Sequence, residues 1–252
     1  MDMGIKGRVA LITGGSMGIG GAAAILLAQE GAHVVISARR EKELAESAAR
    51  IRAEAGVDDV LTISADCTKD EDVQNLVRRV VERHGKVDIL VNSIGAAKAG
   101  HFLKLTDADW EQSLALKLMG QVRTARAVFP HMEKQGWGRI VNVIGTHARL
   151  AEAHAMPAGV ANAGLLNFTR ALAELGGPKG VLVNAVSPGT VNTARLKYLR
   201  DNGVEYDLKT ITLGRFAEAV EIANAIVFLA SERCTYMCGS VVSIDGGQIK
   251  TV

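Results

Sequence analysis

Short runs of apolar residues alternate with longer amphipathic segments along the whole chain. The runs, rich in Val and Ile, predict buried strands at 8–13, 33–37, 60–64, 87–91, 139–143, 181–185 and 241–244. The segments between them, in which apolar side chains recur at helical spacing, predict helices at 18–30, 41–55, 70–84, 107–135, 157–175 and 217–230. Such alternation is typical of a parallel sheet covered on both faces. We therefore predict a single α/β domain over residues 1–252, a doubly wound Rossmann-type fold with a seven-stranded parallel sheet.

The composition of the chain limits the kinds of partner that we expect it to bind. A net charge of +2 gives no general attraction to nucleic acid or to a membrane surface, and no apolar run is long enough to span a bilayer. The N-terminal residues lead straight into the first predicted strand, so we expect no signal peptide and a cytoplasmic location. Three cysteines, an odd number, argue against a disulfide framework, and no histidine lies near Cys234 and Cys238, so we expect no metal site.

A glycine-rich loop separates the first predicted strand from the first predicted helix. Residues 13–20 read Thr-Gly-Gly-Ser-Met-Gly-Ile-Gly. Glycines let backbone amides approach phosphate oxygens, and the helix N-terminus adds partial positive charge. The strand–loop–helix context favours a dinucleotide site over an ordinary tight turn. The residues expected to line it are Gly14, Ser16, Met17, Gly18, Ile19 and Gly20.

The spacing Thr-Gly-x-x-x-Gly-x-Gly resembles that of the short-chain dehydrogenase/reductase family, and further motifs follow in the family's order. They are Asn92-Ser-Ile-Gly95, the segment 184–193 and the segment 236–247. This resemblance covers nearly the whole chain. It implies adenine contacts from Asp66 and its neighbour Cys67, and further cofactor contacts from Asn92, Gly95, Pro188, Gly189, Val191 and Thr193.

The end of the second predicted strand bears on the choice of cofactor. Family members that prefer NAD typically carry an acidic residue there, to bind the ribose 2′-hydroxyl. This chain has Arg39 and Arg40 instead, and arginines can bind a 2′-phosphate. We therefore expect NADP(H) in preference to NAD(H). The alternative is that both arginines are surface charges at a helix start.

The resemblance also implies a catalytic set of Asn, Ser, Tyr and Lys, and this chain lacks it. The matching positions hold Lys117, Gly145, Ala158 and Asn162. A shift of one residue would let Thr146 take the role of the serine. Ala158 has no titratable group, so the family's proton transfer cannot be carried over residue by residue.

Lysine and asparagine stand exchanged between two of these positions, since Lys117 replaces the family's Asn and Asn162 replaces its Lys. A lysine in a partly desolvated cleft can act as a base, as a Schiff-base amine or as a partner for an oxyanion. The alternative is an ammonium that reaches solvent or an acid. His147, Glu152 and His154 precede the helix at 157–175 and are candidates for acid–base work, or are solvated loop residues.

Three functions stay open. The first is a divergent enzyme acting on a small organic molecule through Lys117 and the 147–154 segment, by redox or by non-redox chemistry with a structural nucleotide. The second is an inactive cofactor-binding or regulatory subunit. The third, an ordinary carbonyl reductase or alcohol dehydrogenase, is disfavoured by the missing tyrosine. We expect a substrate loop at about 187–215, with Tyr198 and Tyr206 as possible lid residues, and the resemblance implies a homodimer or homotetramer.

Overall fold

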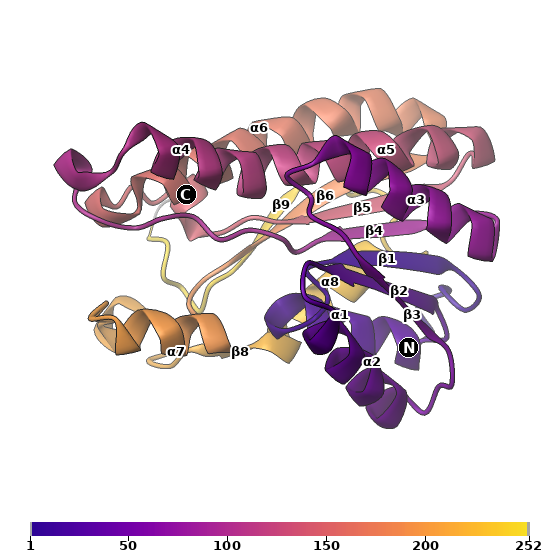
Figure 1. Cartoon of the computed structure of the whole chain (residues 1–252), viewed down its shortest axis with the longest axis horizontal. Helices are drawn as coiled ribbons and strands as arrows, with labels where there is room; N and C mark the ends of the chain where they lie inside the picture. Colours follow the sequence, from indigo (N-terminus) through magenta and orange to yellow (C-terminus); the bar gives the residue numbers. More distant parts are fainter. Residues whose placement is uncertain (1, 251–252) are drawn as a thin grey trace.

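Seven parallel strands form one sheet in the computed structural model, which describes residues 2–250 (Figure 1). Their order is β3-β2-β1-β4-β5-β6-β9, and the predicted doubly wound parallel sheet of seven strands is confirmed. A second, two-stranded sheet pairs β7 with β8. The strands are β1 (Val9–Thr13), β2 (His33–Ala38), β3 (Val60–Ser64), β4 (Ile89–Asn92), β5 (Gly138–Val143), β6 (Val181–Pro188), β7 (Val191–Asn192), β8 (Ala217–Glu218) and β9 (Val241–Ile244).

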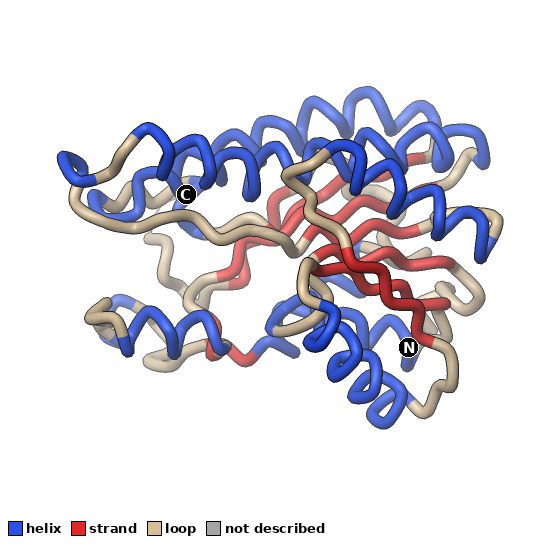
Figure 2. The backbone as a smooth tube through the Cα atoms, in the orientation of Figure 1, coloured by secondary structure: helices blue, strands red, loops and turns tan. Residues whose placement is uncertain are grey.

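The helices fill the intervals between the strands (Figure 2). They are α1 (Gly18–Gln29), α2 (Glu41–Ala55), α3 (Asp70–His84), α4 (Asp107–Leu114), α5 (Gly120–Gln135), α6 (Met156–Gly176), α7 (Ala194–Asp201) and α8 (Ala219–Leu229). Two predicted elements need correction. The strand expected at 87–91 begins at Ile89, and the single helix expected at 107–135 contains a π-helical turn at Ala115–Met119. No helix within residues 2–250 is both long and apolar enough to cross a membrane.

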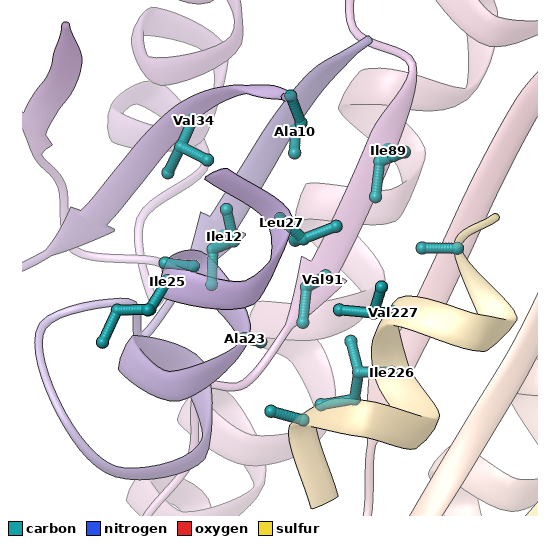
Figure 3. Packing of buried hydrophobic residues seen from close by; sticks show 14 of the residues in the cluster. Ala10, Ile12, Ala23, Ile25, Leu27, Val34, Ile89, Val91, Ile226 and Val227 are labelled. Atoms are coloured by element: carbon teal, nitrogen blue, oxygen red, sulfur yellow. The ribbon is translucent and has the colours of Figure 1, made fainter. Parts of the chain in front are cut away.

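Alternate residues of each strand face opposite layers of helices. Ala10 and Ile12 of β1 pack with α1, α2 and α8 on one face, where Leu27 and Ile226 close the core (Figure 3). Val9 and Leu11 point the other way, toward α3, α5 and α6. Burial on both faces explains why the strands read as continuous apolar runs rather than as alternating ones.

The order of the sheet fixes where a ligand can bind. β1 pairs with β2 on one side and with β4 on the other, so the chain winds in opposite directions from this point. In open α/β sheets, the crevice beyond the carboxyl ends of the strands at such a point is the usual binding site. Figure 1 shows α4 and α7 extending past this edge of the sheet.

Candidate cofactor and substrate cleft

A cleft of about 1030 Å³ lies at the carboxyl ends of the strands. Its walls come from the loops after β1, β2, β4, β5 and β6, and from the π-helical turn, α6 and α7. Most of the residues expected to contact cofactor line it: Gly14, Ser16, Met17, Gly18, Ile19, Arg39, Arg40, Cys67, Gly95, Pro188, Gly189, Val191 and Thr193. All five candidate catalytic residues line it as well: Lys117, His147, Glu152, His154 and Asn162.

The glycine-rich loop is shaped by close approaches of backbone. Gly14 has φ +69°, and a Cβ there would collide with the carbonyl of Ser93. A Cβ at Gly20 would collide with the carbonyl oxygen of Gly14, so Gly20 seats α1 against the loop and does not itself line the cleft. No side chain caps the N-terminus of α1. Its first backbone amides therefore remain available to an anion in the cleft.

The end of β2 offers two polar groups without partners. Ser37 lines the cleft, and its buried hydroxyl has no hydrogen-bond partner within residues 2–250. The Arg39 guanidinium likewise makes no hydrogen bond or ion pair with the described residues, whereas Arg40 Nε lies 2.9 Å from Glu43 Oε1. Arg39 is thus free to meet a ligand, and Arg40 is already paired. Ser37 was missed as a site residue because a serine in an apolar strand gives no signal of its own.

Two predicted cofactor contacts need correction. Asn92 is fully buried, and its side chain bonds Thr124 Oγ1 at 2.6 Å and Asn142 Oδ1 at 3.1 Å. It therefore ties β4 to its neighbours below the cleft and does not reach the cleft surface. Asp66 does not line the cleft either, and its Oδ1 accepts hydrogen bonds from the backbone amide and the hydroxyl of Thr68. Beside it, burial raises the pKa of the Cys67 thiol to about 12, so this thiol stays protonated.

Lys117 enters the cleft from the π-helical turn. Its side chain lies along Gly95, where a Cβ would stand only 2.7 Å from Lys117 Cγ. The residue is partly buried, and within residues 2–250 its ammonium has no hydrogen-bond acceptor and no ion-pair partner. Burial lowers the pKa of Lys117 to about 8, and the charge of Arg195 acts in the same direction. The ammonium can therefore release a proton close to neutral pH.

Asn162 reaches the same cleft from α6 and lies beside Gly145. The distance from Asn162 Nδ2 to the place of a Cβ on Gly145 is 3.2 Å. Asn162 is buried, and its Oδ1 has no hydrogen-bond partner in the described part of the chain. Ala158 and Thr146 line the cleft too, although Thr146 is buried. An unpartnered amide oxygen and an unpartnered ammonium thus share one cavity.

The segment between β5 and α6 places two histidines beside one carboxylate. Glu152 Oε2 lies 3.0 Å from His147 Nε2 and 3.4 Å from His154 Nε2. The fold therefore brings all three candidates together at the cleft wall. A carboxylate shared by two imidazoles can orient them and accept or relay a proton.

The segment after β6 contributes two lining residues that sequence reasoning undervalued. Tyr206 lines the cleft, and burial raises the pKa of its phenol. Tyr198, weighed equally with it, is 62% exposed and does not line the cleft. Arg195 also lines the cleft and donates from Nη2 to the carbonyl oxygen of Ala97 at 3.2 Å. Only the fold, which carries α7 across the cleft, reveals the position of Arg195.

Comparison with known proteins agrees with this architecture. The family model described as enoyl-(acyl carrier protein) reductase matches residues 14–248. The acetoacetyl-CoA reductase of Allochromatium vinosum is 35% identical over 241 residues, covering 95% of this chain and 98% of the relative. The 3-oxoacyl-(acyl-carrier-protein) reductase of Thermotoga maritima is 33% identical over 247 residues, covering 98% and 100%. The chain belongs to the short-chain dehydrogenase/reductase family.

Two solved structures of reductases have the same fold as this chain. The L-sorbose reductase of Gluconobacter frateurii, in complex with NADPH and L-sorbose, superposes with a TM-score of 0.93. It is 36% identical, and the match covers the full length of both chains. Levodione reductase also superposes with a TM-score of 0.93, at 29% identity, over 97% of this chain and 98% of its own. The fold predicted from the strand and helix pattern is confirmed.

Proposed function

We propose that this chain is an NADP(H)-dependent oxidoreductase that interconverts a small carbonyl compound and its alcohol, with Lys117 as the group that exchanges the proton. One observation carries the proposal: the ammonium of a partly buried lysine, without a partner among residues 2–250, lies in the cleft where a dinucleotide would bind. The reductase names of the relatives, and NADPH in the sorbose reductase structure, support the redox class.

The cleft fits the dinucleotide on structural grounds. The glycine-rich loop and the uncapped N-terminus of α1 suit a pyrophosphate. The unpartnered hydroxyl of Ser37 suits a ribose oxygen, and the unpaired guanidinium of Arg39 suits a 2′-phosphate. When bound, the nicotinamide supplies or accepts the hydride. The reductase names of the relatives favour this redox role over a merely structural one.

We further propose that the family's four catalytic positions are all substituted here, by Lys117, Gly145, Ala158 and Asn162. The support is geometric, since all four line one cleft and Asn162 fills the space beside Gly145. In the reductive direction, the substrate oxygen takes a proton from the Lys117 ammonium, and the neutral amine then takes one from water. The amide of Asn162 can hold that water, because its Oδ1 has no other partner in the described chain. Glu152, with His147 and His154, stands at the same wall and can pass protons to solvent.

The test begins with oxidation of NADPH against a panel of small ketones and keto acids. We expect Lys117→Met to lower kcat/KM by about a hundredfold, within the range typical of one general acid. Lys117→Arg should fail equally, because a guanidinium keeps the charge and cannot give up its proton. Lys104→Met removes an exposed lysine outside the cleft and is the matched control. Reductive kcat should fall as pH rises through about 8, as the pKa of Lys117 requires.

The outcomes separate the alternatives. Full activity in Lys117→Met would refute the role of the lysine. If NADPH binds, as measured by nicotinamide fluorescence, and nothing in the panel turns over, the chain is a non-catalytic cofactor-binding subunit and the enzyme proposal fails. If NADPH and NADH both fail to bind, the cofactor proposal fails.

Restoring the family's pair tests the substitution of the catalytic positions. Ala158→Tyr with Asn162→Lys returns a phenol and its activating ammonium to neighbouring turns of α6, four residues apart. We expect this double variant to show ketone reduction that survives Lys117→Met. The single variant Ala158→Tyr is the control and should gain little, because an unassisted phenol has a pKa near about 10. Activity of the double variant that still depends wholly on Lys117 would contradict the assignment of these positions.

We also propose that residues 187–215 cover the substrate and that the chain forms a homodimer or homotetramer. Arg195 and Tyr206, both from this segment, line the cleft and support the first point. Val160 and Leu175 of α6, 50% and 52% exposed, support the second, because apolar side chains on an exposed helix gain by packing against another copy. Mass photometry tests the assembly, and a monomer at micromolar concentration would refute it.

A further inference from the structure

Two cationic side chains, Lys117 and Arg195, line the cleft, and neither has an ion-pair partner among residues 2–250. Lys117 reaches it from the π-helical turn, and Arg195 reaches it from the first turn of α7. Burial lowers the pKa of Lys117, and the positive charge of Arg195 acts in the same direction. Within residues 2–250 neither side chain makes an ion pair, and the single hydrogen bond of the guanidinium goes to the carbonyl of Ala97.

The acids of the cleft do not neutralise this pair. Glu152 lies between His147 and His154, at 3.0 and 3.4 Å. Glu205 and Asp207 line the cleft as well, but neither comes within ion-pair distance of Lys117 or Arg195 in the described structure. Asp207 is occupied by the backbone amide of Lys209 at 2.9 Å. Lys117 is poorly solvated and Arg195 is exposed at the same cleft, so an anion that contacts both would relieve the cost of the unpaired charge on Lys117.

We propose that the substrate carries a carboxylate and that Arg195 binds it, so that the substrate class is a small oxo acid and its hydroxy acid. The proposal rests on the proposed function, in which Lys117 serves the reacting oxygen of the same molecule. A guanidinium matches a carboxylate with two parallel hydrogen bonds, and the donors of Arg195 that do not reach Ala97 are free to make them. Arg195 is then the specificity residue, and Lys117 acts on the neighbouring carbonyl oxygen.

A matched pair of probes tests the charge alone. 4-Oxopentanoate and its methyl ester differ only in the carboxylate, and each is titrated by calorimetry into protein saturated with NADP⁺, so that no turnover occurs. We expect the acid to bind about tenfold more tightly than the ester, as one charge-assisted contact requires. Arg195→Gln should abolish this difference and leave the affinity for the ester unchanged.

Two controls test whether Arg195 itself binds the anion, and whether that anion is the substrate carboxylate or a phosphate of the cofactor. Arg200→Gln removes the same charge from the exposed side of α7, outside the cleft, and should preserve the preference for the acid. The affinity of Arg195→Gln for NADPH should equal that of the parent. A matching loss of NADPH affinity would show that Arg195 binds a phosphate of the dinucleotide, which overturns the proposal.

Three further results would overturn the proposal. Equal affinity for acid and ester in the parent overturns the proposal, and so does failure of both to bind below about 10 mM. Retention of the acid preference in Arg195→Gln does the same. The readout is binding and not turnover, so it can fail while the Lys117 mechanism stands. Conversely, loss of the Lys117 mechanism leaves a measured carboxylate preference intact.

Discussion

Replacing Lys117 by methionine should stabilise the protein at neutral pH, because the parent holds a poorly solvated charge there. Burial lowers the pKa of this ammonium from 10.5 to about 8. At about 1.4 kcal/mol for each pH unit, that difference corresponds to about 3 kcal/mol of cost to the charged form. The side chain is partly open to solvent, and screening reduces the net value to about 1–2 kcal/mol. We expect a rise in Tm of roughly 2–8 °C at pH 7.

The gain should disappear in alkali, and the sign follows from proton binding. Below about pH 8 the lysine is charged in both folded and unfolded states, so the full cost is present. Between about 8 and 10.5 the unfolded chain binds more protons than the folded one, so the stability of the parent rises with pH. Above that window the amine is neutral in both states and no cost remains. The advantage of the methionine variant must shrink across the same window.

Denaturant unfolding followed by circular dichroism from pH 7 to 10.5 measures this difference, with Lys104→Met as the control for loss of an exposed lysine. The control should follow the parent at every pH. A methionine variant less stable than the parent at pH 7 would refute the reasoning, because the ammonium would then have a partner that stabilises it. An advantage that stays constant with pH would refute it equally, because packing and not charge would be its source.

Three further predictions concern the frame of the cleft. Gly95→Ala should cost more than about 2 kcal/mol and abolish turnover, because Gly95 has φ +136° and a Cβ would strike Lys117. Gly100→Ala should be silent in the same thermal melt and assay, because its φ is ordinary and a Cβ would meet only Leu105 Cδ2, at 3.7 Å. Arg39→Ala should weaken NADPH binding by about tenfold or more and leave NADH binding unchanged, as measured by fluorescence titration. Arg40 is already paired with Glu43, so Arg40→Ala should change the affinity for either cofactor much less. Asp88→Ala should lower the free energy of unfolding, measured in urea, by about 3 kcal/mol. The buried carboxylate accepts a hydrogen bond from a backbone amide of β1 at 2.8 Å and forms ion pairs with two basic side chains. Unchanged stability would contradict this reasoning.

The fold was predictable because its signals are local. Runs such as 9–13 and 33–38 are apolar throughout, since helices cover both faces of the strands, and the glycines of the loop at 13–20 are required by close backbone approaches. The π-helical turn was not predictable. Its residues, Ala115–Met119, are ordinary helix formers and give no local signal for a wider turn.

The cleft was predictable only in part, because polar residues at strand ends look alike in sequence. Asn92 is the last residue of β4 and Ser37 the last but one of β2. The side chain of Asn92 forms hydrogen bonds beneath the cleft, whereas the buried hydroxyl of Ser37 has no partner among residues 2–250. Arg195 lies in an irregular segment far from Lys117 along the chain. No periodicity links the two, so their meeting depended on the path of α7 across the carboxyl edge of the sheet.

The π-helical turn makes the path from α4 to α5 one residue longer than a regular helix would need. Each residue of an α-helix advances by about 100°, so the surplus residue sets the rotation of α4 relative to α5. Deleting one residue from 115–119 would restore regular geometry and turn α4 by about that angle about its axis. The buried faces of α5 would stay in register, while Ser113, which accepts the amide of Lys98, would swing away from its partner. A single surplus residue thus decides which face of α4 turns toward Lys98, while the packing of α5 on the sheet stays the same.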